Sequence, residues 1–304
     1  RGHPPLSDLS LDEQPWQRPS VARIYDVLLG GVHHTAVDRA AAEVVLGQMP
    51  DLAGVLRADR ALLGRVVRRL CAAGIRQFLD LGSGLPTMGQ AHEHTNEHAP
   101  TARVVYVDLD PVAVAIGEQV LAGHRYATMV RADLRDPGAV LADPLVGDLI
   151  DPARPVGVLM IGVLHLLADD EDPAGVVAAL ADVVAPGSYL AVSHMGPVER
   201  QTPVGMARAK DTYRRSGGAM HPRSPGEIEA LLAGWQLRPP GLVAVPLWCP
   251  DPDTAPLPSD VTFPGLAALA YRTAPPPVPG ARRPTDGVNR RHGAGVRVPG
   301  PGRR

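Results

Sequence analysis

Apolar residues recur at helical spacing in the first part of the chain. In the segment PSVARIYDVLLGG, Val21, Ile24 and Leu28 are three or four residues apart, so they would share one face of a helix. Ser20 can cap this helix at its start, and Gly30 can end it. Two further helices are predicted by the same spacing, over 36–49 and 56–73.

From residue 75 onward, short apolar runs alternate with helical intervals. The runs that predict strands are IRQFLDL, RVVYVD, YATMVRAD, VGVLMIG and SYLAVSHM. Helices are predicted between them over 87–97, 112–121 and 173–184. Near the end, GLVAVPLW and GLAALAYR are predicted to form a terminal strand pair. This alternation is typical of an α/β protein with a doubly wound, mostly parallel sheet.

The same pattern divides the chain into regions. Residues 1–18 are rich in Pro and polar side chains and are predicted to form a flexible arm. Residues 19–273 would form one domain, with a helical cap over 19–74 and an α/β core over 75–273. Residues 274–304 carry few large apolar groups among Pro, Gly and Arg, so we expect a disordered tail.

Composition limits the partners of the domain. The formal net charge is -2, but seven Arg against Asp286 give the tail about +6 and leave the rest at about -8, which argues against nucleic-acid binding. The sequence shows no apolar run near the roughly 20 residues of a membrane-spanning helix. Two cysteines far apart in sequence, Cys71 and Cys249, favour a cytoplasmic location with free thiols. A small-molecule partner is therefore expected, and the oligomeric state is left open.

The turn DLGSGLP after the first predicted strand is the leading candidate for a cofactor site. A dinucleotide fold would place a third glycine where Thr87 stands, and a phosphate-binding Walker loop would need a nearby lysine. A carboxylate before the glycines, Asp80, would repel a pyrophosphate and attract a ligand with ammonium and sulfonium groups. S-adenosylmethionine is such a ligand, and the glycines at 82 and 84 would let its methionine half approach the backbone.

Acidic residues also end the next two predicted strands. Asp108 can accept hydrogen bonds from both ribose hydroxyls, whereas Asp110 before Pro111 is better suited to cap a helix. Asp133 can accept from the adenine amino group, and the amide of Leu134 can reach a ring nitrogen. Three acids at successive strand ends, the first before a Gly-x-Gly turn, favour S-adenosylmethionine as the ligand over a dinucleotide or a phosphate bound by a Walker loop.

The chain resembles the class I S-adenosylmethionine-dependent methyltransferases, and among them a bacterial family known as S-adenosyl methyltransferase, whose methyl acceptor is unassigned. The resemblance spans roughly 19–247 and is carried by stretches such as PSVARIYDVLLGG, GIRQFLDLGSGLPT, ARVVYVDLDPV, ADLRDP and VLHLLADDEDPAG. It implies a Rossmann-like sheet of seven strands with an antiparallel last strand, a helical cap over the cofactor, and S-adenosylhomocysteine as the second product.

The candidate site residues follow from these motifs. Tyr25 would close over the cofactor, and Arg57 or Arg60 could bind the methionine carboxylate with a guanidinium group. The resemblance places His165 near the transferred methyl group, where it could orient or deprotonate the acceptor; a purely structural histidine is the alternative. The cofactor-binding residues are predicted to be Tyr25, Arg60, Asp80, Gly82, Ser83, Gly84, Asp108, Leu109, Asp133 and Leu134.

Two other interpretations stay open. The segment HEHTNEH places His94 and His98 four residues apart, but a third metal ligand is not evident nearby, so we expect a solvated helix face and no metal. The chain could instead be a regulatory protein that binds S-adenosylmethionine or S-adenosylhomocysteine without catalysis. A nicotinamide-dependent oxidoreductase is disfavoured by Asp80 and by Thr87.

Overall fold

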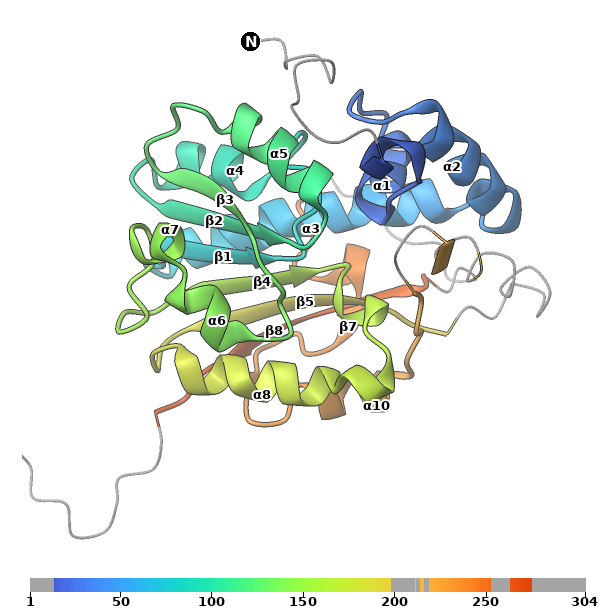
Figure 1. Cartoon of the computed structure of the whole chain (residues 1–304). Coiled ribbons are helices and arrows are strands. Elements are labelled where there is room, and N and C mark those ends of the chain that lie inside the picture. The colour runs from blue at the N-terminus through green and yellow to red at the C-terminus, as the bar shows by residue number, and fades with distance from the viewer. Residues whose placement is uncertain (1–13, 198–210, 212–213, 216–218, 253–262, 275–304) are drawn as a thin grey trace, which may run out of the picture. The chain divides into compact units, whose positions relative to one another are not determined.

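The sheet at the centre of the fold has the strand order β3-β2-β1-β4-β5-β8-β6, with β7 paired to β8 (Figure 1). The strands are β1 Gln77–Leu81, β2 Arg103–Asp108, β3 Ala127–Arg131, β4 Gly157–Ile161, β5 Tyr189–Met195, β6 Gln236–Leu237, β7 Val243–Ala244 and β8 Gly265–Tyr271. β1 to β5 pair in parallel, and β8 runs antiparallel to β5, β6 and β7. The doubly wound sheet and its antiparallel last strand are therefore confirmed.

The computed structural model describes residues 14–197, 211, 214–215, 219–252 and 263–274. The chain divides into two units, residues 1–274 and 275–304, and the fold described is that of the first. The tail expected over 274–304 lies outside the described residues from 275 onward, as does the arm up to residue 13. Gln14–Gln17 form a short 3-10 helix, and Trp16 packs on the hydrophobic core, so this part of the expected arm is structured.

The predicted helices lie within about four residues of their predicted limits: α1 Val21–Leu29, α2 Ala36–Gln48, α3 Leu52–Ala72, α4 Ala91–His98, α5 Pro111–Val120 and α8 Pro173–Val183. Among the described residues, the structure adds three short helices that were not predicted, α6 Pro137–Ala142, α7 Pro144–Gly147 and α10 Pro225–Leu231. The side chain of Ser20 accepts a hydrogen bond from the amide of Arg23, and Gly30 ends α1 with a φ of 81°, as their residue types predict.

Three details of the prediction differ from the structure. α3 begins at Leu52 instead of 56, because Val55 and Leu56 belong to its buried face. α4 begins at Ala91 instead of 87, because the preceding residues form the turn after β1. The sheet has eight strands instead of seven, because the two-residue strands β6 and β7 pair separately with β8.

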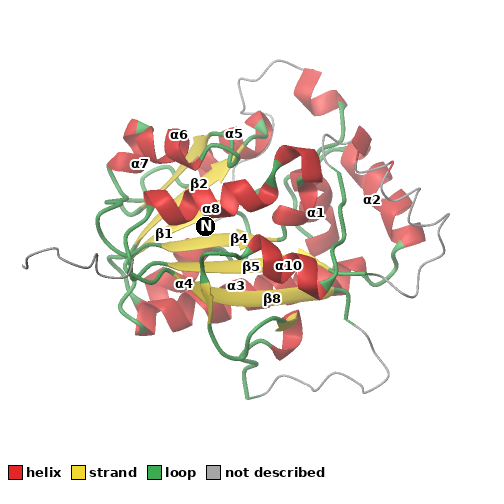
Figure 2. Ribbon diagram, turned by 90° about the horizontal axis from the view of Figure 1, so that it is seen from below, coloured by secondary structure: helices red, strands yellow, loops and turns green. Residues whose placement is uncertain are grey.

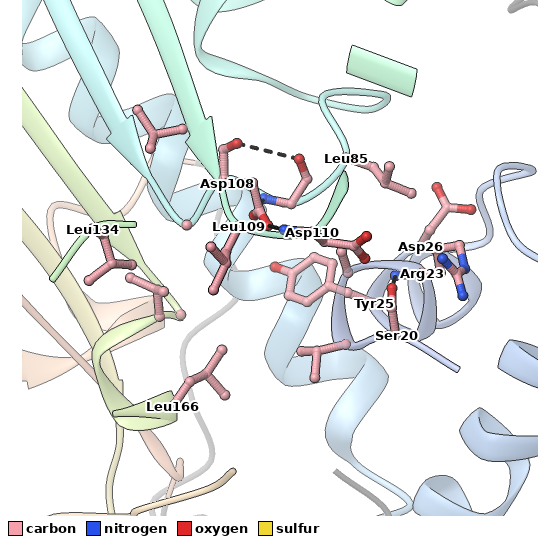
Figure 3. Close-up of a pocket in the computed structure, with 18 of the residues that line it drawn as sticks. Ser20, Arg23, Tyr25, Asp26, Leu85, Asp108, Leu109, Asp110, Leu134 and Leu166 are labelled. Atoms are coloured by element: carbon pink, nitrogen blue, oxygen red, sulfur yellow. Dashed lines mark hydrogen bonds between the residues drawn. The ribbon is translucent and has the colours of Figure 1, made fainter. Parts of the chain in front are cut away.

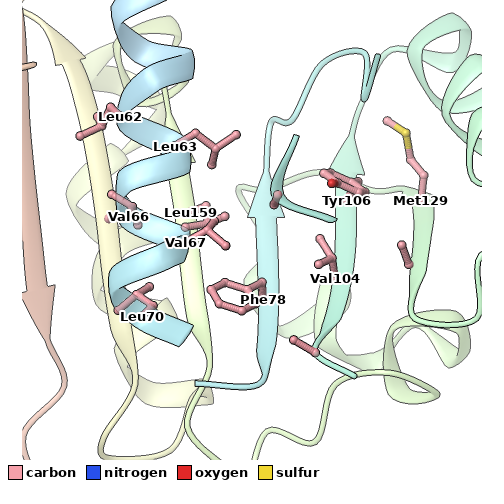
Figure 4. Packing of buried hydrophobic residues seen from close by; sticks show 14 of the residues in the cluster. Leu62, Leu63, Val66, Val67, Leu70, Phe78, Val104, Tyr106, Met129 and Leu159 are labelled. Atoms are coloured by element: carbon pink, nitrogen blue, oxygen red, sulfur yellow. The ribbon is translucent and has the colours of Figure 1, made fainter. Parts of the chain in front are cut away.

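Helices cover both faces of the sheet, which explains why every residue of β1 is buried. On one face, α3, α4 and α5 pack on β1 to β4, in a cluster that includes Phe78, Tyr106 and Leu159 (Figure 4). On the other face, residues of α6, α7 and α8 form a second cluster. Figures 1 and 2 agree in placing α8 and α10 opposite α3 and α4.

A third cluster joins α1, α2 and the start of α3 beyond one end of the strands (Figure 2). Its core includes Ile24 and Val45, and Met195 at the end of β5 packs into it. A buried ion pair between Arg23 and Asp38, 2.8 Å apart, ties α1 to α2. This helical cap therefore lies at the end of the sheet where the parallel strands finish.

Candidate active site

A pocket of about 800 Å³ opens at the carboxyl ends of β1 to β4, between the strand-end loops and α1. Figure 3 shows Asp108, Leu109 and Leu134 from these loops facing the same space as Tyr25 of α1. This position follows from the topology, because the carboxyl ends of parallel strands meet at one edge of the sheet. All ten residues predicted to bind the cofactor line this pocket, which we call the cofactor pocket: Tyr25, Arg60, Asp80, Gly82, Ser83, Gly84, Asp108, Leu109, Asp133 and Leu134.

The glycine turn after β1 requires glycine at position 82. Gly82 and Gly84 have φ of 68° and 64°, in the left-handed region that favours glycine. A Cβ atom on Gly82 would lie 2.2 Å from Cγ2 of Val163, so any side chain there would displace the loop after β4. The Gly82 amide donates to the carbonyl of Val107 over 2.8 Å. The turn is thus held against β2 and leaves its outer side to the pocket.

Asp80 places a buried carboxyl group at the floor of the cofactor pocket. Asp80 lies near the end of β1 and is 5% exposed. Burial raises the pKa of Asp80 to about 7, while Arg60 opposes this rise and Asp108 adds to it. Ionisation of a buried carboxyl group costs free energy, and a positively charged ligand bound beside it offsets this cost.

Asp108 holds the turn and the start of α5 at the same time. Its Oδ2 accepts from the amide of Gly84 over 2.8 Å, and its Oδ1 accepts from the amide of Asp110 over 2.9 Å. Burial raises the pKa of Asp108, and these backbone hydrogen bonds act against the rise. Asp110 accepts from the Val112 amide over 2.8 Å, so its predicted role as the cap of α5 is confirmed.

Asp133 lies at a more exposed position than the other two strand-end acids. Its carboxylate accepts hydrogen bonds from the guanidinium of Arg135, at 2.5 Å for the closest atom pair, and Arg135 also binds Glu171. These hydrogen bonds lower the pKa of Asp133. The charge of Asp133 is therefore already balanced within the protein.

Two residues of the helical cap cover the cofactor pocket. The guanidinium carbon of Arg60 lies 5.1 Å from the centre of the Tyr25 ring, a cation–π contact. The Tyr25 hydroxyl donates to the carbonyl of Leu56 over 3.4 Å. Arg57, the alternative to Arg60 for the methionine carboxylate, is exposed and does not line the pocket.

The cap is also hydrogen-bonded to the glycine turn. Oδ1 of Asp26 in α1 accepts from the hydroxyl of Thr87 over 3.2 Å, and Oδ2 accepts from the amide of His33 over 2.8 Å. Gly31 leaves room for this carboxylate, since a Cβ atom there would lie 2.1 Å from Oδ1. Thr87, which stands in place of a third glycine, therefore joins the turn to the cap.

A second pocket of about 40 Å³ adjoins the first, and we call it the inner pocket. Both pockets are lined by Val21, Tyr25, Gly162 and Leu166, so a group in the inner pocket lies next to the cofactor pocket. His165, the predicted catalytic residue, lines the inner pocket and not the cofactor pocket.

His165 is a neutral side chain with one nitrogen already occupied. Burial lowers its pKa to about 3, and the nearby His194, Arg223 and His221 lower it further. The amide of Met195 donates to Nδ1 over 3.4 Å, so the proton of the neutral ring is on Nε2. This geometry allows His165 to donate a hydrogen bond and makes it a poor base.

Sequence reasoning missed Asp59, which also lines the inner pocket. Asp59 lies on the buried face of α3, between Leu56 and Leu62. Burial raises its pKa to about 6, while a hydrogen bond from Ser193 and the charge of Arg60 oppose the rise. The available signal was an acid placed at helical spacing within an apolar stripe, where an exposed side chain is not expected.

The segment HEHTNEH differs in part from the expected solvated face. His92 is buried in α4, and its Nδ1 lies 2.7 Å from the hydroxyl of Tyr106. His94 packs on Gly64 of α3, whereas His98 is exposed. Within the described residues, no three His, Cys, Asp or Glu side chains are grouped so that they could hold a metal ion.

Comparison with known proteins identifies the family. Residues 10–273 match the family described as S-adenosyl methyltransferase. A methyltransferase candidate from Thermobifida fusca YX is 38% identical, with a TM-score of 0.77 over 85% of this chain and 97% of that one. A DUF574-family protein from Streptomyces avermitilis MA-4680 is 33% identical, with a TM-score of 0.76 over 84% of this chain and 98% of that one. The comparison with curated proteins gave no match.

The fold and the match together define the class: this chain is an S-adenosylmethionine-dependent methyltransferase with a Rossmann-like sheet. In particular, it belongs to the S-adenosyl methyltransferase family. The described part of the chain has no helix long and apolar enough to cross a membrane.

Proposed function

We propose that the cofactor pocket binds S-adenosylmethionine through the strand-end residues and that a small molecule accepts the methyl group. The pocket fits this cofactor, because Gly82 lacks the Cβ that would fill the turn and Asp80 offers a buried carboxylate to a cation. Asp80 and residues 82–84 would hold the methionine half, Asp108 with Leu109 the ribose, and Asp133 with Leu134 the adenine. When bound, the cofactor supplies a methyl group on a positively charged sulfur.

The helical cap would orient the cofactor and exclude water. Tyr25 lines both pockets and Arg60 lines the cofactor pocket, so they can cover the methionine half of the cofactor while the acceptor lies in the inner pocket. His165 would orient the acceptor by contact with its ring, since its Nδ1 is occupied by the Met195 amide. Alignment and desolvation of this kind can lower the barrier to an in-line displacement.

A small acceptor is supported by the size of the inner pocket and by charge. About 40 Å³ is room for a few heavy atoms. The excess of acidic residues outside the tail disfavours a polyanion. The acceptor would enter beneath a wall that includes residues 197–234, of which 198–210, 212–213 and 216–218 lie outside the described residues. A cytoplasmic location is supported by the free thiols of Cys71 and Cys249.

The test is transfer of a labelled methyl group. The full chain is incubated with methyl-labelled S-adenosylmethionine and with separate metabolite, nucleic-acid and protein fractions, and label is expected in a metabolite. Calorimetry with S-adenosylhomocysteine and with NAD provides the cofactor control. Label confined to nucleic acid or protein would contradict the small-molecule acceptor. Binding of NAD without binding of S-adenosylhomocysteine would contradict the proposed cofactor contacts.

A further inference from the structure

The inner pocket contains one formally charged side chain among the residues that line it, that of Asp59. Burial lowers the pKa of His165 to about 3 and that of His194 to about 4, so both rings are neutral near pH 7. The remaining walls are apolar apart from the Tyr25 hydroxyl and backbone groups. They include Val21, Leu52, Val55, Leu56, Met195 and Met220.

The carboxyl group of Asp59 has unused hydrogen-bonding capacity. Asp59 is 6% exposed, and its carboxyl group accepts a hydrogen bond from the side chain of Ser193. Oδ1 is buried and has no hydrogen-bond partner among the described residues. Such an oxygen is costly unless a ligand or a proton satisfies it.

The nearest cation does not fill this role. Arg60 adjoins Asp59 in sequence and lowers its pKa by its charge. However, Arg60 lines the cofactor pocket and stacks on Tyr25, so the inner pocket itself is left with a net negative charge. A hydroxyl acceptor would satisfy Oδ1 but leave that charge uncompensated. An ammonium group would satisfy both the hydrogen bond and the charge.

We propose that the methyl acceptor is a small amine, which enters the inner pocket as an ammonium ion, pairs with the carboxylate of Asp59 and transfers a proton to Oδ1. This inference rests on the proposed function, since it specifies the acceptor of the same reaction. His194 is excluded as the base, because Arg223 donates to its Nε2 over 3.1 Å and its Nδ1 donates to the carbonyl of Met195 over 2.8 Å.

The proton balance is consistent with the environment. The ammonium nitrogen loses one proton to Asp59, which becomes a neutral carboxyl group. The nitrogen lone pair then forms the bond to the methyl carbon while the carbon–sulfur bond breaks, and that electron pair stays on sulfur in S-adenosylhomocysteine. Burial disfavours both charged partners, so transfer of the proton from ammonium to carboxylate neutralises both at once. The methylated nitrogen carries the positive charge formerly on sulfur, so the product leaves as an ammonium ion, and Asp59 returns its proton to solvent, since its pKa is about 6.

Binding to the full chain saturated with S-adenosylhomocysteine tests this inference without turnover. Isobutylamine and isobutanol have the same carbon skeleton and are titrated by calorimetry at pH 8, where Asp59 is ionised and the amine is protonated. The amine is expected to bind about tenfold more tightly than the alcohol, because it makes a charge-assisted hydrogen bond. In Asp59→Asn this preference is expected to disappear.

The control variant changes an acid outside the inner pocket. Asp51→Asn alters an exposed acid at the start of the same helix and is expected to keep the amine preference. Equal binding of the two probes by the unaltered protein would overturn the proposal, as would an unchanged preference in Asp59→Asn. The comparison of probes needs no variant, so it decides the matter even if Asp59→Asn fails to fold. S-adenosylhomocysteine affinity is measured first, and its absence would count against the proposed cofactor contacts and not against Asp59.

Discussion

The two adjoining pockets are built in different ways. The cofactor pocket is formed mainly by loops that directly follow β1 to β4, and its polar groups come from residues at strand ends such as Asp80 and Asp108. The inner pocket draws on α1, α3, the loop after β4, β5 and the start of β8, which are brought together from distant parts of the sequence. Local motifs therefore describe most of the cofactor pocket, whereas the inner pocket depends mainly on packing between distant segments.

The difference extends to electrostatics. Asp133 is partly exposed and paired with Arg135, and its pKa is lowered by that contact. Asp80 and Asp59 are buried, and burial raises the pKa of each, to about 7 and about 6. A buried acid without a full partner costs stability and so indicates a ligand site more strongly than an exposed ion pair does. Substitution of the buried acids is therefore expected to change ligand binding more than substitution of Asp133.

The largest effect is expected for Gly82→Ala. The added Cβ would lie 2.2 Å from Val163 in a residue with φ of 68°, so steric overlap adds to backbone strain. Together these are expected to lower the free energy of unfolding by about 2–5 kcal/mol and to abolish measurable S-adenosylhomocysteine binding. Urea unfolding and calorimetry measure both.

The matched control is Gly89→Ala, which has φ of 58° and nothing within 4 Å of the added Cβ. It isolates the backbone strain, and a loss of about 1 kcal/mol is expected. Equal losses in the two variants would show that contact with Val163 does not restrict position 82.

Asp80→Asn is expected to weaken S-adenosylmethionine binding by about 1.5–3 kcal/mol, because it removes an interaction with a charged group. It should also stabilise the unliganded protein at pH 8 by on the order of 2–4 kcal/mol, since Asp80 has a pKa of about 7 when folded against 3.8 for the isolated group. Calorimetry and chemical unfolding at several pH values measure these effects.

The sign of this pH dependence is fixed by the raised pKa. The folded protein binds the proton of Asp80 more tightly than the unfolded chain does, so stability falls as pH rises from about 4 to about 7. Asp80→Asn is expected to flatten this slope, and Asp182→Asn, which alters an exposed acid on α8, should leave it unchanged. A slope that survives in Asp80→Asn would assign it to other groups, Asp59 among them.

Asp108→Ala is expected to cost about 1.5–3 kcal/mol of S-adenosylhomocysteine affinity through the lost ribose contact. It also frees the amides of Gly84 and Asp110, so some stability is lost as well. Asp110→Ala serves as the comparison, because it removes the cap of α5 and should cost about 1 kcal/mol of stability with little change in affinity. A larger loss of S-adenosylhomocysteine affinity in Asp110→Ala than in Asp108→Ala would indicate that Asp110 binds the ribose.

The smallest effect is expected for Asp133→Asn. Its carboxylate is partly exposed and already bound by Arg135, so the cofactor affinity should fall by less than about 1 kcal/mol. Calorimetry with S-adenosylhomocysteine at low and high salt measures the change. A tenfold or larger loss of S-adenosylhomocysteine affinity would show that Asp133 contributes to binding as strongly as Asp80 and Asp108.

Sequence reasoning succeeded where structure is local. The strand β1, the glycine turn after it and the caps at Ser20 and Asp110 depend on a few neighbouring residues, and each was predicted from them. The predicted pair of GLVAVPLW with GLAALAYR is present, but only Val243–Ala244 of the first run form a strand. Sequence reasoning failed for β6, because two residues carry no periodic pattern and their pairing depends on β8.

The sequence by itself determined the alternation of β1 to β5 with helices, the family, and ten of the residues around the cofactor pocket, because strand ends in a parallel sheet must converge. Only the tertiary structure decided the surroundings of Asp59 and His165. Burial by α1, α3, β5 and β8 keeps the His165 ring neutral and gives Asp59 a raised pKa beside an apolar cavity. Desolvation depends on contacts between segments far apart in the chain, and no local pattern records them.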